Sequence, residues 1–418
     1  MRFKSTMVSL GLLALAGTAG AQEANSVFSY SGFGTIGYVM TDSDNATYTT
    51  GGQKNGATTH GSFEPDSKIG FQVNGKFNDT FSGTVQLFAK QDAVGAYGPS
   101  VEWAFLKAKL GAGFSARVGR MGGPFFMTSD FRNVGYTNVT MRTPPDVYAA
   151  VPVRSFDGAD LLYQGNLGDV TLNAQLYGGK ASVVVGQDIK LTLNDVAGIS
   201  LSAEVGPVTV RAGHIETKFD SEGSGLTGFY QILGGLTQLS AAPGLSSLGT
   251  LSNDIAINGK KASFDGIGAT IEVGNWVGSA EVTKRKTDSL YVSDVSSWYT
   301  TVGYRVKKFT PYVTFSGRTQ DSVTSATAPA VGTYPAPYAP SVQGLIGAVN
   351  TNILGSQTQK TLAFGSRWDV GSSYALKGEW ALISVPAGSA GGFSAVKGGR
   401  FASDTTINVL SLGLDFVF

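Results

Sequence analysis

The chain has 418 residues, of which 57 are Gly, 24 are Phe, 16 are Tyr and none is Cys. A chain of this length can bury a stable core without disulfide bonds, and its glycine share is about twice the usual ~7%, which favours many short strands and turns. The 31 basic and 30 acidic residues leave a formal net charge of +1, so the overall charge gives no indication of a nucleic-acid partner.

Residues 1–21 have the order of a secretory signal peptide. Two basic residues precede an apolar run over 7–16, and small residues then lead to a cleavage site after Ala21. We expect one mature domain over residues 22–418. The apolar run is too short to cross a bilayer, and no other stretch approaches the roughly 18 apolar residues that a transmembrane helix needs.

The clearest strand pair begins after the first long polar stretch. Over residues 67–77, apolar and Gly positions alternate with Lys, Gln and Asn, and the alternation resumes over 81–87 after Asn78-Asp79. Alternation with period two places the two sets on opposite faces of a strand, and a short turn joins antiparallel strands. Similar short turns are predicted at residues 168–169, 206–207, 274–275, 307–308 and 371–372.

Long polar connections separate these hairpins. Short turns at one rim and long loops at the other are typical of an antiparallel barrel that crosses a membrane, and less so of a soluble sandwich. The long connections are expected at residues 41–66, 121–153, 180–196, 217–261, 319–357 and 385–405.

The barrel is expected to have about sixteen strands, an even number that returns both chain ends to the rim of short turns. Aromatic residues flank those turns and predict a girdle at the membrane surface. The strands should start near residues 27, 67, 81, 101, 113, 156, 169, 197, 208, 262, 276, 296, 309, 358, 374 and 406. The girdle residues are Phe77, Phe81, Trp276, Tyr304, Phe309, Tyr312, Trp368 and Tyr374.

The last eleven residues, 408–418, alternate in character. Leu410, Leu412, Leu414 and Phe416 share one face with the terminal Phe418, and the residues between them are smaller and more polar. This pattern indicates a strand with lipid on one side and water on the other.

Residues 22–418 resemble the trimeric general porins of Gram-negative outer membranes. The resemblance is carried by the Gly-rich segment 31–38, by Ala-Arg-Val-Gly-Arg at 116–120 and by the terminal segment 412–418. It implies an all-β transmembrane barrel in outer-membrane lipid, a homotrimer, and passive diffusion of small hydrophilic solutes and ions. It also implies that the barrel-assembly machinery recognises the strand ending at Phe418, and that no cofactor is needed.

The resemblance further implies that the third extracellular loop, which follows the fifth strand, folds into the lumen. This connection runs from residue 121 to about Arg154, and its aromatic side chains, such as Phe125 and Phe126, could pack against the barrel wall. Its Gly-Gly-Pro-Phe-Phe run at 122–126 lacks the glutamate that the family often carries there.

Basic residues outnumber acidic ones along this connection. Rings of Arg or Lys favour anions, so we expect a mild anion preference, and neutral replacements of Arg117 and Arg120 should shift selectivity toward cations. The candidate constriction residues are Arg117, Arg120, Asp130, Arg132, Arg142, Asp146 and Arg154, with Arg211 and Lys377 on strands.

Two alternatives from other functional classes stay open. One is a substrate-specific channel for small carboxylates or aromatic acids. The other is an outer-membrane barrel enzyme, but a general base is commonly His, and His60 and His214 are the only two. Residues 32–37 match G-x-G-x-x-G, yet a strand follows where dinucleotide binding needs a helix. We therefore predict no catalytic, cofactor or metal site.

Overall fold

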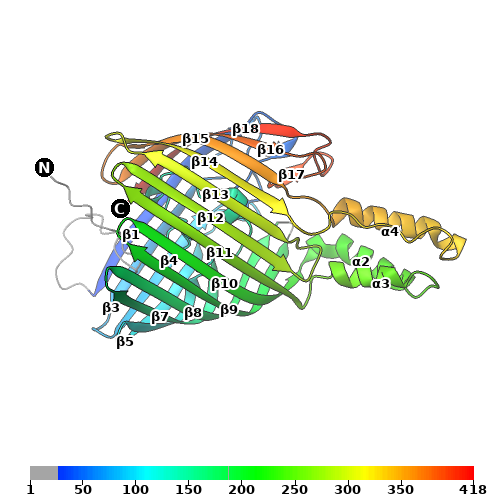
Figure 1. The fold of residues 1–418 in the computed structure, drawn as a ribbon, viewed down its shortest axis with the longest axis horizontal. Helices are drawn as coiled ribbons and strands as arrows, with labels where there is room; N and C mark the ends of the chain where they lie inside the picture. The colour runs from blue at the N-terminus through cyan, green and yellow to red at the C-terminus, as the bar shows by residue number, and fades with distance from the viewer. Residues whose placement is uncertain (1–26, 187) are drawn as a thin grey trace.

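In the computed structural model, which describes residues 27–186 and 188–418, sixteen antiparallel strands close into one barrel (Figure 1). The expected signal peptide, residues 1–21, lies outside the described residues. The barrel strands are β1 (Phe28–Thr41), β3 (Lys68–Lys76), β4 (Phe81–Lys90), β5 (Ser100–Gly111), β6 (Phe114–Gly122), β7 (Ser155–Leu167), β8 (Val170–Val185), β9 (Ile189–Val205), β10 (Val208–Glu222), β11 (Lys260–Val273), β12 (Trp276–Thr287), β13 (Val295–Tyr304), β14 (Phe309–Gln320), β15 (Gln359–Asp369), β16 (Tyr374–Val385) and β18 (Thr405–Val417).

The remaining elements lie in the connections between barrel strands. The short strands β2 (Ala46–Thr47) and β17 (Ala395–Val396) pair with each other outside the barrel sheet. The helices are η1 (Gly135–Thr137), α1 (Pro145–Tyr148), η2 (Ser224–Leu226), α2 (Thr227–Leu239), α3 (Ser246–Ile255), η3 (Ala336–Tyr338) and α4 (Ala339–Asn352). None of the helices in the described part of the chain is long and apolar enough to cross a membrane.

The pairing of β1 with β18 closes the barrel and confirms the predicted terminal strand. Leu410 and Leu412 are exposed on the outer face, whereas Ser411 and Asp415 are buried on the inner face. The glycines of β1 are needed for this closure, because a Cβ at Gly34 would lie 2.3 Å from the ring of Phe416. The Gly-rich segment therefore makes room for aromatic rings and continues as a strand, as β1 shows.

The predicted strand starts agree with the structure to within a few residues, with one exception. Residues 180–196, which were expected to form a connection, belong mostly to strands: β8 continues to Val185, and β9 begins at Ile189. Register shifts interrupt the pairing at Gly179/Ala181. A bulge of this kind breaks the period-two pattern, which is why the sequence there resembles a loop.

Most predicted girdle residues are exposed beside the short turns, including Trp276, Phe309 and Trp368. Tyr312 is the correction: its side chain is 5% exposed and its hydroxyl donates to Glu379 Oε2 at 2.8 Å. It lies inside the barrel because it shares a face of β14 with buried Thr310 and Thr314.

Three helices project from the rim that carries the long connections, as Figure 1 shows for α2, α3 and α4. The sequence predicts polar loops for the connections at residues 217–261 and 319–357, which contain these helices. Leu236, Leu248, Val342 and Val349 are instead fully buried in a core that the three helices share. The rim with the short turns, where the C-terminus lies, is at the opposite end of the barrel (Figure 1).

Candidate functional site

The connection between β6 and β7, residues 123–154, lies inside the barrel and is called the crossing loop below. The amide of Met127 donates to Glu281 Oε1 on β12 at 2.8 Å, and the amide of Met141 donates to the Tyr312 hydroxyl on β14 at 2.8 Å. Both partners face the lumen, so the loop is held by hydrogen bonds to the inner wall. Phe126 packs in the same interior, with its ring centroid 4.5 Å from that of Tyr148 and 5.1 Å from that of Phe264.

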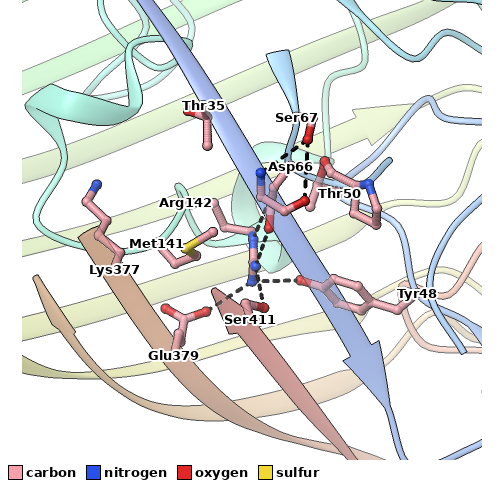
Figure 2. Close-up of polar contacts among 12 residues, drawn as sticks. Thr35, Tyr48, Thr50, Asp66, Ser67, Met141, Arg142, Lys377, Glu379 and Ser411 are labelled. Atoms are coloured by element: carbon pink, nitrogen blue, oxygen red, sulfur yellow. Dashed lines mark hydrogen bonds and ion pairs between the residues drawn. The ribbon is translucent and has the colours of Figure 1, made fainter. Parts of the chain in front are cut away.

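Arg142 is the most extensively bonded side chain of the crossing loop (Figure 2). Its Nε and Nη2 donate to the two carboxylate oxygens of Asp66, at 2.8 and 2.6 Å. Its Nη1 donates to Glu379 Oε1 at 3.0 Å and to the Tyr48 hydroxyl at 3.2 Å, and its Nη2 also donates to Ser411 Oγ at 2.6 Å. A buried guanidinium is stable only when paired and hydrogen-bonded in this way. The cluster ties the loop to β16, β18 and the first long connection.

Lys377 on β16 anchors the neighbouring part of the loop. Its Nζ lies 2.8 Å from Asp415 Oδ2 and donates to the carbonyls of Gly135 and Thr140 at 2.7 and 2.9 Å. Thr35 Oγ1 donates to the other oxygen of Asp415 at 2.5 Å. A Cβ at Gly135 would lie 2.1 Å from Asp415 Oδ1, so only glycine fits this approach.

Two acidic side chains of the loop bond to further parts of the wall: β14 and β15, next to β16, and β10, across the barrel. Asp146, at the start of α1, accepts from Ser316 Oγ and from Gln359 Nε2, each at 2.5 Å. Asp130 pairs with Nη1 of Arg211 on β10 at 2.9 Å. The loop is therefore tied to the barrel on several sides, and it divides the lumen rather than lining one wall.

Arg154 ends the crossing loop beside β5. Its Nε donates to Glu102 Oε1 at 3.0 Å, and Asn133 Nδ2 donates to the same oxygen at 3.2 Å. The Arg154 guanidinium also lies over the ring of Phe88, 5.3 Å from its centroid. This end of the loop is thus held by one shared carboxylate.

A cavity of about 10 Å³ remains between the loop and the wall at this end. Gln86, Glu102, Asp130, Arg132 and Arg154 are among the residues that line it. A space of this size is close to that of a single water molecule.

On the β3–β5 side of the crossing loop, three cations have no carboxylate partner within 4.0 Å in the described part of the chain: Lys68, Lys90 and Arg132. Lys90 donates only to the carbonyl of Gly51, at 3.1 Å. Arg132 lies over the ring of Phe126, 5.7 Å from its centroid. Burial, and then the charge of Arg154, lower the pKa of Arg132 to about 10. The guanidinium stays charged at neutral pH. The space between the crossing loop and the wall around this cavity, called the gap below, therefore has an excess of positive charge.

Two predicted residues lie away from this cluster. Arg117 faces the lumen but forms an ion pair with Asp160 on β7, through Nε at 3.0 Å, and does not contact the crossing loop. Arg120 lies on the outer face with exposed Val118, and its Nε and Nη2 pair with Asp157 at 2.7 Å each. Residues three apart on a strand point in opposite directions, so Arg120 does not line the constriction as predicted.

The other seven predicted residues are brought together around the loop, but sequence reasoning missed several of their partners. Period two places Glu379 on the face of Lys377 and Asp415 on the face of Ser411, both inside the barrel, but it does not indicate which cation each one binds. Asp66 and Tyr48 belong to the first long connection, where no periodic pattern exists, and nothing in the sequence marks them as partners of Arg142.

Comparisons with known proteins agree with this architecture. No protein-family model and no curated protein matches the chain. Among solved structures, OmpF of Salmonella typhi matches with a TM-score of 0.53 at 12% identity, over 94% of this chain and 97% of that one. An anion-selective porin of Comamonas acidovorans matches with a TM-score of 0.50 at 13% identity, over 94% and 99%. The trimer form of OmpT of Vibrio cholerae matches with a TM-score of 0.50 at 10% identity, over 94% and 100%. The chain therefore has the sixteen-stranded fold of the Gram-negative porins.

Proposed function

We propose that this protein is an outer-membrane pore through which small hydrophilic solutes and ions diffuse passively, with a mild preference for anions. The observation that carries the preference is the unpaired positive charge of Lys68, Lys90 and Arg132 beside the gap. The carboxylates nearest to them, Asp66, Glu102 and Asp415, are already bonded to Arg142, Arg154 and Lys377. Unbalanced cations at a constriction attract anions and repel cations.

A narrower function is the second candidate: a channel specific for small carboxylates. The small cavity beside Arg132 and the bonds that tie the crossing loop to opposite walls both favour it. Solutes that bind the positive gap would then have an advantage over those that only diffuse. Notably, small anions would pass more readily than neutral sugars of the same size.

The test is the reversal potential of the refolded protein in a planar bilayer under a KCl gradient. We expect a potential of the sign for anion selectivity. The variant Arg132→Gln should reduce it, and Arg305→Gln is the matched control, because Arg305 pairs with Glu272 at 2.9 Å away from the gap. Cation selectivity of the unchanged protein, or equal shifts in both variants, would contradict the charge assignment.

The pore is proposed to be a homotrimer in outer-membrane lipid. Residues 1–21 would direct export and then be cleaved, and the strand that ends at Phe418 would direct assembly of the barrel. The outer face supports this setting, since large apolar side chains such as Leu106, Val118 and Ile267 are more than half exposed on it. Mass determination of the detergent-solubilised protein by light scattering tests the trimer. A monomer mass with intact channel activity would remove the trimer from the proposal.

A further inference from the structure

A patch of polar residues on the inner faces of β12, β13 and β14 takes no part in the constriction described above. In the sheet register, Ser297 of β13 lies opposite Arg318 of β14, and Val295 lies between Arg285 of β12 and Gln320 of β14. Directly opposed residues have Cβ atoms about 4.5–5.5 Å apart, and diagonal neighbours about 7–8 Å apart. The two arginines, Ser297 and Gln320 therefore occupy one continuous patch of the wall.

Arg318 is a buried cation without a partner. Its side chain is 6% exposed, and it makes no hydrogen bond or ion pair within residues 27–186 and 188–418. Its Nε is fully enclosed and has no acceptor. A buried charge is stable only when it is paired, so this guanidinium is directed toward a group that the chain itself does not supply.

The polar atoms around Arg318 are also unpaired. Among the residues that the structure describes, Ser297 Oγ has no hydrogen-bond partner, and neither does Nε2 or Oε1 of Gln320. Buried polar side-chain atoms are nearly always bonded in folded proteins. Several unpaired groups on one patch indicate a shared missing partner rather than separate local defects.

The second arginine adds charge without a carboxylate. Arg285 Nη1 donates to the Ala150 carbonyl at 2.7 Å, and its Nη2 donates to the Ser293 carbonyl at 2.7 Å. Both acceptors are neutral. Its guanidinium is therefore held in place at the end of the crossing loop with its positive charge uncancelled by any contact within 4.0 Å.

The two carboxylates that influence these arginines are bonded elsewhere. Asp146 accepts from Ser316 and Gln359, and Asp294 accepts from the amide of Thr287 at 2.8 Å. Asp146 acts on Arg318 and Asp294 acts on Arg285 only from beyond ion-pair distance. The patch thus combines two guanidiniums with uncommitted hydroxyl and amide donors.

We propose that Arg318, Arg285, Ser297 and Gln320 form a binding subsite for the oxyanion group of a small solute, a carboxylate or a phosphate. The planar fork of an arginine matches two oxygens of such a group, and the Ser297 hydroxyl and Gln320 amide supply further donors. The subsite lies nearer the long-connection rim than the Ser316–Asp146 contact, because β14 runs toward that rim from Phe309 to Gln320. An anion bound there is held beside the crossing loop before it reaches the gap.

This inference rests on the proposed channel, and its test separates the two. Isothermal titration of the folded, detergent-solubilised protein with succinate, and in a second arm with inorganic phosphate, measures binding without any requirement for conductance. The current in a planar bilayer, recorded separately in KCl, measures the channel. Binding without current would reject the channel and keep the subsite. Current without binding would keep the channel and reject the subsite.

The decisive variant is Arg318→Gln, and Arg305→Gln is its control. Each removes one positive charge, and the two positions lie toward opposite ends of the lumen. We expect affinity for at least one probe to fall about tenfold or more in Arg318→Gln and to stay within about twofold in Arg305→Gln. Arg318→Lys keeps the charge but loses the fork, and it should restore only part of the affinity. Unchanged affinity in a folded Arg318→Gln protein, or equal losses in both glutamine variants, would overturn the subsite. Heat-modifiable electrophoretic migration checks that each variant forms the barrel.

Discussion

Arg142 holds both carboxylate oxygens of Asp66, at 2.8 and 2.6 Å, although the two residues belong to different connections of the barrel. Both side chains are less than a tenth exposed. This contact joins the first long connection to the crossing loop, and Glu379 joins the same guanidinium to the wall. One buried cation therefore joins three parts of the molecule, the first long connection, the crossing loop and the wall.

Replacing Arg142 by Gln should destabilise the barrel and loosen the crossing loop. The change leaves the buried carboxylates of Asp66 and Glu379 without their cation, and removing one partner from a buried pair costs about 3–5 kcal/mol. We expect a lower urea midpoint and larger fluctuations of the single-channel current. Arg120→Gln is the matched control: its pair with Asp157 is partly exposed, and such pairs contribute about 0–1 kcal/mol. Similar losses in the two variants would contradict the central role of Arg142.

Replacing Gly135 by Ala should release the same loop from its second anchor. A Cβ at this position would overlap Oδ1 of Asp415, whose other carboxylate oxygen, Oδ2, is paired with Lys377. Something must shift, and overpacking of this kind costs about 1–3 kcal/mol. We expect faster proteolytic cleavage within the crossing loop. Gly228→Ala is a suitable control, because nothing lies within 4 Å of a Cβ there. Equal cleavage rates would show that the anchor does not hold the loop.

Period-two alternation, together with the spacing of short turns and long connections, predicted the barrel and most strand starts. The same rule places Arg211 and Lys377 inside, since each follows an outward apolar residue by one position. The rule also corrects the prediction for Arg120. Arg117 and Arg120 lie three positions apart on one strand, so their side chains cannot share a face. The alternation is informative because a barrel wall has only two environments.

Features without a period could not be predicted in the same way. The partnership of Arg142 with Asp66 joins two irregular connections, and its energy comes from desolvation in a space that exists only after the barrel closes. The helices α2 and α4 lie in stretches without charged residues, 223–253 and 322–359. Their apolar positions have the spacing of a helix, but Gly and Pro in the same stretches favour loops.

Removing positive side-chain charges beside the gap should change the ion selectivity, whereas removing a positive charge from the outer face should not. The double variant Lys90→Gln with Arg132→Gln removes two cations that have no carboxylate partner, so the reversal potential should move toward cation selectivity by more than in either single variant. Arg120→Gln removes a cation from the outer face and should leave the potential unchanged. The measurement is the bilayer potential under a KCl gradient. A shift in Arg120→Gln as large as in the double variant would place the selectivity outside the crossing loop.

The helices that project from the rim should be separable from conduction. Leu236 is fully buried among α2, α3 and α4, and replacing it by Asp places a charge in an apolar core, which should unfold the helices. Gln231 of the same helix is exposed, and Gln231→Asp is the matched control with the same added charge. We expect faster proteolysis within residues 223–259 in Leu236→Asp alone, with unchanged conductance in both variants, because the helices lie beyond the barrel and the crossing loop is bonded to the wall. A fall in conductance confined to Leu236→Asp would instead show that the helices support the pore entrance.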